Sequence, residues 1–84
     1  MYRRQVVLRQ AAALRGRRAR EFHELTRGFR ARAWLDDGRR RVDAQSMIGL
    51  LAAEPEPGRP VLLLADGPDE RESVHAMEAF LLQP

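Results

Sequence analysis

The spacing of apolar residues changes several times along the chain, and each change marks a new predicted element. Near the N-terminus, Val6 and Leu8 stand two apart in a short apolar run, which predicts a strand with both side chains on one face. From Arg17 to Arg27 the apolar positions recur three or four residues apart among good helix formers, which predicts a helix. Gly28 follows, and we expect it to end that helix in a left-handed turn.

A β-hairpin is predicted in the segment that follows. The pair Asp37-Gly38 is of the kind that joins two antiparallel strands. On either side of this pair, apolar and polar positions alternate, so the apolar ones are expected to face a core. These apolar positions are Ala31, Ala33, Leu35 and Val42.

The second half of the chain continues with helix, strand and helix. Ser46 precedes "MIGLLAA" and is typical of the residue that caps a short helix. The segment "EPEPGRP" contains three prolines, which exclude a helix interior and a central strand. The nearly all-apolar "VLLLA" predicts a buried strand.

The last predicted helix follows "DGP". Asp69 and Glu72 are three residues apart, as in a capping box, in which each of the two side chains accepts a hydrogen bond from a free backbone N–H group. The apolar residues after them recur at helical spacing and define the face that is expected to pack. They are Val74, Met77, Phe80 and Leu81.

The predicted order is therefore strand, helix, strand, strand, helix, strand, helix. This order is typical of an α+β fold: a four-stranded antiparallel sheet with three helices on one face. With 84 residues, the chain is expected to form a single domain over residues 1–84, too small for a cleft between two domains.

Composition excludes several classes of protein. There is no cysteine, so a disulfide framework, a thiol nucleophile and a thiolate zinc site are all impossible. No apolar run approaches the roughly 20 residues of a membrane span, and "MYRRQVVLRQ" lacks the apolar stretch of a secretory signal. We expect a soluble, cytoplasmic protein.

Charge is distributed unevenly. Residues 1–42 contain thirteen arginines and four acidic residues, whereas residues 43–84 contain two arginines and eight acidic residues. Every basic residue other than histidine is arginine, which suits bidentate contact with carboxylate or phosphate. Acidic proteins, phosphorylated groups and nucleic acid are all compatible partners. The alternative is that arginine usage reflects coding bias and that the two halves neutralise each other in the fold.

No catalytic constellation is evident. His23 and His75 lie on separate predicted helices without a ligand-spaced neighbour that would bind zinc, and we expect both to be solvated or boundary residues. Ser46 lacks the Gly-x-Ser-x-Gly turn of hydrolases, and the chain has no glycine-rich phosphate loop. We therefore predict neither an enzyme nor a bound cofactor or metal.

Nucleic acid is a possible partner on composition alone. Dense arginine groups stand at the start of the first helix and at the hairpin, but only Trp34 and Tyr2 are candidates for stacking against bases. The acidic second half would repel a phosphate backbone, so this partner is the less favoured alternative. The two groups are Arg15, Arg17, Arg18 and Arg20, and Arg39, Arg40 and Arg41.

Three motifs, taken with the element order, point to a family. "AQSMIGLL" (residues 44–51) looks like a capped helix whose serine precedes two apolar residues and a glycine, and "LADGPDERESV" (64–74) like a strand end with an acidic entry into the last helix. "ALRGRRA" (13–19) is the third. Over essentially its whole length the chain resembles HPr, the histidine-containing phosphocarrier family of the bacterial phosphoenolpyruvate-dependent sugar phosphotransferase system. Further matching positions are Leu14, Arg17, Ala19, Gly28 and Phe29.

The match breaks in "ALRGRRA". The family pattern there is Gly-Leu-His-Ala-Arg-Pro-Ala, so Arg15 takes the position of the phosphorylated histidine and Arg18 that of the proline. A guanidinium stays protonated and has only donors, so Arg15 cannot accept a phosphoryl group. Arg17 is retained and could contact an anion at the start of the helix.

The resemblance then implies a regulatory or protein-binding variant, not a phosphocarrier. In many Gram-positive family members the serine that matches Ser46 is phosphorylated, so the resemblance implies phosphotransferase-system components, a serine kinase or a transcriptional regulator as partners. Alternatives are a working phosphocarrier with another acceptor and an arginine-rich nucleic-acid-binding module. The candidate binding residues are Arg15, Arg17, Arg20, Met47 and Leu51.

Overall fold

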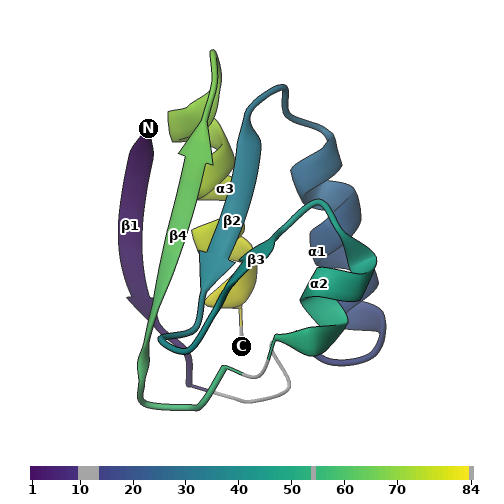
Figure 1. Cartoon of the computed structure of the whole chain (residues 1–84), viewed down its shortest axis with the longest axis vertical. Helices are drawn as coiled ribbons and strands as arrows, with labels where there is room; N and C mark the ends of the chain where they lie inside the picture. The colour runs from purple at the N-terminus through teal and green to yellow at the C-terminus, as the bar shows by residue number, and fades with distance from the viewer. Residues whose placement is uncertain (10–13, 54, 84) are drawn as a thin grey trace.

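A computed structural model describes residues 1–9, 14–53 and 55–83. It contains four strands and three helices in the predicted order, with the N-terminal strand at one edge of the sheet (Figure 1). The elements are β1 (Tyr2–Val7), α1 (Arg17–Arg27), β2 (Arg32–Asp36), β3 (Arg41–Asp43), α2 (Met47–Ala52), β4 (Pro60–Asp66) and α3 (Glu70–Leu81).

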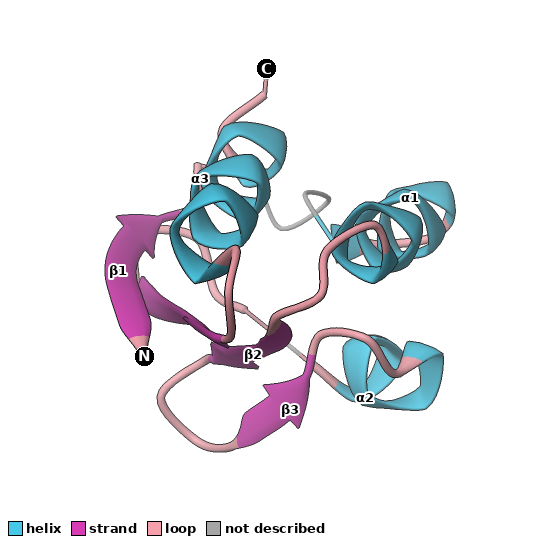
Figure 2. Cartoon of the chain, turned by 90° about the horizontal axis from the view of Figure 1, so that it is seen from above, coloured by secondary structure: helices cyan, strands magenta, loops and turns pink. Residues whose placement is uncertain are grey.

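The strands form one antiparallel sheet in the order β1-β4-β2-β3. Seen from above, α1 and α3 cover one face of this sheet, and α2 lies beside α1 near β3 (Figure 2). The predicted fold, an α+β sandwich open on one face, is confirmed.

Alternation along the strands explains which residues form the core. Val6 pairs with Val61, and Leu35 pairs with both Leu63 and Val42, and all five are buried. Because side chains alternate across a strand, these residues share the face that the helices cover.

β4 is apolar on both faces, as the run "VLLLA" predicts. Leu64 points to the opposite face from Leu63, yet only 1% of its surface is exposed. Its neighbours across the sheet are Arg3 and Trp34, and these larger side chains flank it on the open face.

The prediction that "EPEPGRP" excludes a central strand is wrong at its last residue. Pro60 begins β4, where the missing N–H is tolerated because it is the first residue of the strand.

α1 packs through Ala19, Phe22 and Thr26, all of which are buried. The buried Thr26 hydroxyl donates to the Ala44 carbonyl oxygen at 2.9 Å, which ties α1 to the segment before α2. Gly28 does end the helix, but at φ −74° it is right-handed, so the predicted left-handed turn is wrong.

The predicted capping box of α3 is also wrong. The Asp69 carboxylate does not cap its own helix; it accepts from the backbone N–H groups of Arg30 and Ala31, at 2.9 and 2.7 Å. These hydrogen bonds, first the one from Arg30, lower the pKa of Asp69 below its ordinary value. Glu70, not Glu72, reaches back to accept from the Gly67 N–H at 3.2 Å. The last turn before α3 is therefore joined to the loop that precedes β2.

Candidate functional site

The chain turns sharply just before α1. Gly16 is the residue that precedes the helix, at φ +58°, a conformation that side-chain-bearing residues rarely adopt. The Arg18 N–H donates to the Arg15 carbonyl oxygen at 3.1 Å and closes this turn. Ala13, the first residue of "ALRGRRA", lies outside the described residues.

Arg15, Arg17 and Arg20 present free cations along this end of α1. All three are exposed, and within the described ranges none of them forms an ion pair. No carboxylate among the described residues pairs with these positive charges, which favours an anionic partner.

Ser46 caps α2 as predicted. Its Oγ accepts from the Gly49 N–H at 3.1 Å, and the residue is half-buried. Gly49 packs closely against the end of β3, since a Cβ there would lie 3.1 Å from the Asp43 carbonyl oxygen. The cap thus holds a short helix whose outer face is apolar.

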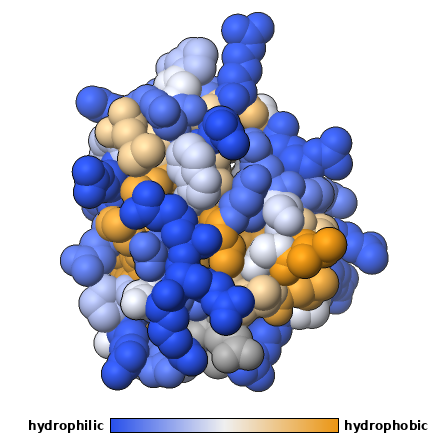
Figure 3. Space-filling model, viewed as in Figure 1, coloured by the Kyte–Doolittle hydropathy of each residue, from blue (hydrophilic) through white to orange (hydrophobic). Residues whose placement is uncertain are grey.

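That outer face consists of Ile48 and Leu51, which are 82% and 64% exposed. Figure 3 shows hydrophobic residues gathered over α2 on the face that it draws. Met47, a candidate binding residue, is half-buried, whereas the more exposed Ile48 was not among the predicted candidates. The signal was available: Ile48 and Leu51 are three apart and share a face, opposite to the buried Leu50.

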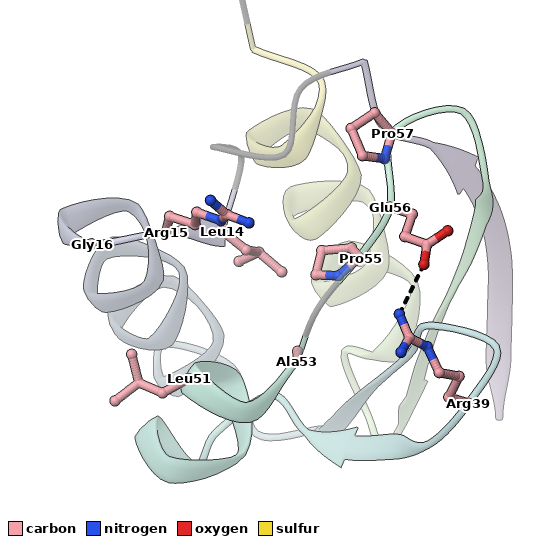
Figure 4. A pocket seen from close by; sticks show the side chains of 9 residues that line it. All are labelled: Leu14, Arg15, Gly16, Arg39, Leu51, Ala53, Pro55, Glu56 and Pro57. Atoms are coloured by element: carbon pink, nitrogen blue, oxygen red, sulfur yellow. Dashed lines mark hydrogen bonds and ion pairs between the residues drawn. The ribbon is translucent and has the colours of Figure 1, made fainter.

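Between α1, α2 and the segment before β4 lies a cavity of about 540 Å³. In Figure 4, Leu14 and Arg15 project from one side, and an ion pair between Arg39 and Glu56 stands on the other. The structure thus brings Arg15 and Leu51, both predicted site residues, to one cavity. Its lining residues are Leu14, Arg15, Gly16, Arg39, Leu51, Ala53, Pro55, Glu56 and Pro57.

Arg18 behaves differently from its neighbours. Its Nη2 donates to the Phe80 carbonyl oxygen at 2.9 Å and its Nη1 to Gln83 Oε1 at 3.2 Å, while its guanidinium carbon lies 4.3 Å from the Phe80 ring centre. Arg18 thus fastens α1 to the end of α3. Sequence spacing carries no signal for this contact, because 62 residues separate Arg18 from Phe80.

The two histidines are not brought together. His23 is half-buried on α1, and His75 is exposed on α3, where its Nε2 lies 3.2 Å from the Tyr2 hydroxyl. Among residues 1–9, 14–53 and 55–83, no group of three or more acidic or histidine side chains could hold a metal. Over the same ranges, no helix has the length and hydropathy to cross a membrane.

The stacking candidates for nucleic acid are less accessible than the sequence suggests. Tyr2 is half-buried against the core and meets the ring of His75 edge-on, with centroids 5.5 Å apart. Trp34 is half-buried on the open face of the sheet, with the guanidinium carbon of Arg32 5.6 Å from its ring centre.

The sheet order, the three helices on one face and the capped α2 define an HPr-like open-faced sandwich. The family model described as "PTS HPr component phosphorylation site" matches residues 2–83, and the chain belongs to this family. The family resemblance in the sequence is therefore confirmed.

Related proteins and a solved structure support this family membership. The HPr-like protein Crh of Halalkalibacterium halodurans is 27% identical over 81 residues, covering 96% of each chain. The HPr-like protein Crh of Bacillus subtilis is 28% identical over 81 residues, covering 96% of this chain and 95% of that protein. The crystal structure of HPr-C-His from Thermoanaerobacter tengcongensis has a TM-score of 0.87 at 25% identity, covering 96% of this chain and 91% of that one.

Proposed function

We propose that this protein is a regulatory, protein-binding member of the HPr family that does not itself carry phosphoryl groups. The observation that carries the proposal is Arg15, which the sequence pattern aligns with the family's phosphorylated histidine. A guanidinium has no free lone pair with which to attack phosphorus. Similarity to two proteins named HPr-like supports a role related to the phosphotransferase system.

Partner binding is assigned to the α1–α2 face, the exposed surface made by the starts and outer sides of these two helices. Ile48 and Leu51 supply exposed apolar area, which is worth about 25 cal/mol for each Å² that a partner covers. The arginines at the start of α1, which form no ion pair within the described ranges, favour an acidic partner and would accelerate its association. The α1–α2 face consists of Arg15, Arg17, Arg20, Met47, Ile48 and Leu51.

Ser46 is the proposed point of regulation. Its Oγ already lies at the start of α2, where unpaired backbone N–H groups and the helix dipole favour negative charge. A phosphate there would place a charge of about −2 beside Ile48 and within the same face as the arginines. The proposed partners are therefore a serine kinase and a protein that distinguishes the two forms of Ser46.

A phosphotransfer assay tests the first part of this proposal. The purified protein is incubated with phosphoenolpyruvate and the first enzyme of the phosphotransferase system, beside a histidine-bearing HPr as the positive control. We expect acid-labile phosphate on the control alone. Acid-labile phosphate on His23 or His75 of this chain would show that it is a phosphocarrier after all.

A kinase assay tests the second part. With ATP and an HPr serine kinase, we expect one phosphate on the wild type and none on Ser46→Ala. Ile48→Ser and Leu51→Ser are expected to slow the reaction by about tenfold, which corresponds to the loss of about 1.4 kcal/mol of contact. Leu82→Ser is the matched control, since Leu82 is also exposed, at 47%, but lies after α3. Equal slowing in all three variants would contradict docking through the α1–α2 face.

A further inference from the structure

We propose that the cavity beside Arg15 is a binding site for a phosphate monoester, with the phosphate held by Arg15 and Arg39 and the organic group against the apolar lining. Its volume, about 540 Å³, lies within the range of small-molecule sites. This ligand site goes beyond the protein docking proposed above.

Among the described residues that line the cavity, positive charges outnumber negative charges. The Glu56 carboxylate accepts from Arg39 Nη2 at 2.9 Å and lies 3.2 Å from Arg59 Nε, so one anion serves two guanidiniums. Arg15 lines the same cavity and has no ion-pair partner in the part of the chain that the structure describes. Among the described lining residues, the two cations Arg15 and Arg39 therefore face one carboxylate, which Arg59 also shares from outside the lining, and this excess of positive charge favours a dianion.

Arginine and phosphate are geometrically suited to each other. The planar guanidinium offers paired N–H donors that match two phosphate oxygens. An incoming dianion would compete with Glu56 for Arg39, and Glu56 can stay paired with Arg59 when Arg39 turns to the ligand. Glu56 therefore keeps a cationic partner when the ligand is bound.

The rest of the lining favours an organic group over a bare ion. Leu14, Leu51, Ala53, Pro55 and Pro57 form apolar walls around the two arginines. A ligand that bears a compact apolar group on its phosphate would remove this surface from water and bind more tightly than inorganic phosphate. The same chemistry is presented by a small phosphorylated metabolite and by a phosphoserine in a peptide.

Titration of the ¹⁵N-labelled protein tests the site without any protein partner. Phenyl phosphate at about pH 8, where the monoester is a dianion, is expected to shift the amides of Leu14, Arg15 and Gly16 saturably. Inorganic phosphate lacks the apolar group, and benzenesulfonate lacks the second negative charge. Both are expected to bind at least about fivefold more weakly than phenyl phosphate. A capped phosphoserine tripeptide that binds more tightly than phenyl phosphate would indicate a protein source; one that binds more weakly would indicate a metabolite.

Removing an arginine and removing a carboxylate are expected to change the affinity for phenyl phosphate in opposite directions, which makes the test specific. Arg15→Ala and Arg39→Ala are expected to weaken phenyl phosphate by about tenfold, and Glu56→Gln to strengthen it severalfold by releasing Arg39. Arg40→Ala is the matched control, since it removes the same charge from the same hairpin without lining the cavity. Glu21→Gln on α1 controls in the same way for the loss of a remote carboxylate.

The proposal is overturned if the amide shifts do not saturate, or if inorganic phosphate binds as well as phenyl phosphate. Equal weakening by Arg39→Ala and Arg40→Ala would also overturn it, because the effect would then be one of net charge and not of this cavity. Failure of this titration leaves the kinase and phosphotransfer assays unaffected, since they involve no small ligand at the cavity.

Discussion

Replacing Arg18 by alanine removes the polar link between the first turn of α1 and the end of α3. The lost contacts are the hydrogen bonds to the Phe80 carbonyl oxygen and to Gln83, and the stacking of the guanidinium on the Phe80 ring. Phe80 in turn packs against Phe22, with ring centroids 5.6 Å apart, so the link joins the outer polar contacts to the core.

The size of the effect follows from these contacts. A hydrogen bond from a charged donor contributes about 1.5–3 kcal/mol, and because Arg18 is only half-buried the lower end applies. The cation–π contact adds about 0.5 kcal/mol at a partly exposed site. The exposed bond to Gln83 is weak by comparison, so we expect Arg18→Ala to lower the free energy of unfolding by about 2 kcal/mol.

Urea denaturation followed by circular dichroism measures this loss. Arg20→Ala is the control, because Arg20 is exposed on the same helix and forms no ion pair with any described residue, and we expect a change within about 0.5 kcal/mol. Arg18→Lys keeps the charge but not the planar fork, so an intermediate loss is expected. If Arg18→Ala were as stable as Arg20→Ala, the contact with α3 would contribute nothing to folding.

Three further predictions concern α3 and the turn before it. Gly67→Ala would place a Cβ 2.7 Å from the Ala31 Cα at a φ of +152°. We expect it to lower the free energy of unfolding by about 3 kcal/mol in thermal melts. Gly38→Ala is the control: its backbone is strained but its Cβ meets no neighbour, so the expected loss is about 1 kcal/mol. The Ser73 hydroxyl is buried without a partner in the described part of the chain, so Ser73→Ala should raise that free energy by about 1 kcal/mol in urea melts. The folded-state pKa of Asp69 is lowered, so its contribution is complete above the ordinary carboxyl pKa and is lost as the pH falls through the folded value. The difference in urea midpoint between wild type and Asp69→Ala should therefore shrink as the solution is acidified; a constant difference would contradict the role of its charge.

The elements of this fold could be predicted because each is encoded by its own spacing. Alternation placed Val6, Leu35 and Val42 on one face of the sheet, and all three are buried. Helical spacing gave both bounds of α1, and a single serine gave the start of α2. Local patterns of this kind depend only on which side of a strand or helix meets the core.

The error at the start of α3 arose because a polar side chain there has two competing partners. Asp69 stands at a helix start and has the composition of a cap, yet its carboxylate accepts from the N–H groups of Arg30 and Ala31, which lie far away in sequence. Which partner a carboxylate takes is decided by the tertiary arrangement, which sequence spacing does not contain. The cavity beside Arg15 was beyond prediction for the same reason, since its walls come from three separate segments.

Arg15 and Arg18 are chemically identical side chains three residues apart in "ALRGRRA", and they have opposite surroundings in the fold. Arg18 is half-buried and bound to α3, so its removal is expected to change stability. Arg15 is exposed, makes no ion pair within the described residues and lines a cavity with surplus positive charge, so its removal should leave folding nearly unchanged. Loss of binding in an Arg15 variant would then report on binding itself and not on a change in stability.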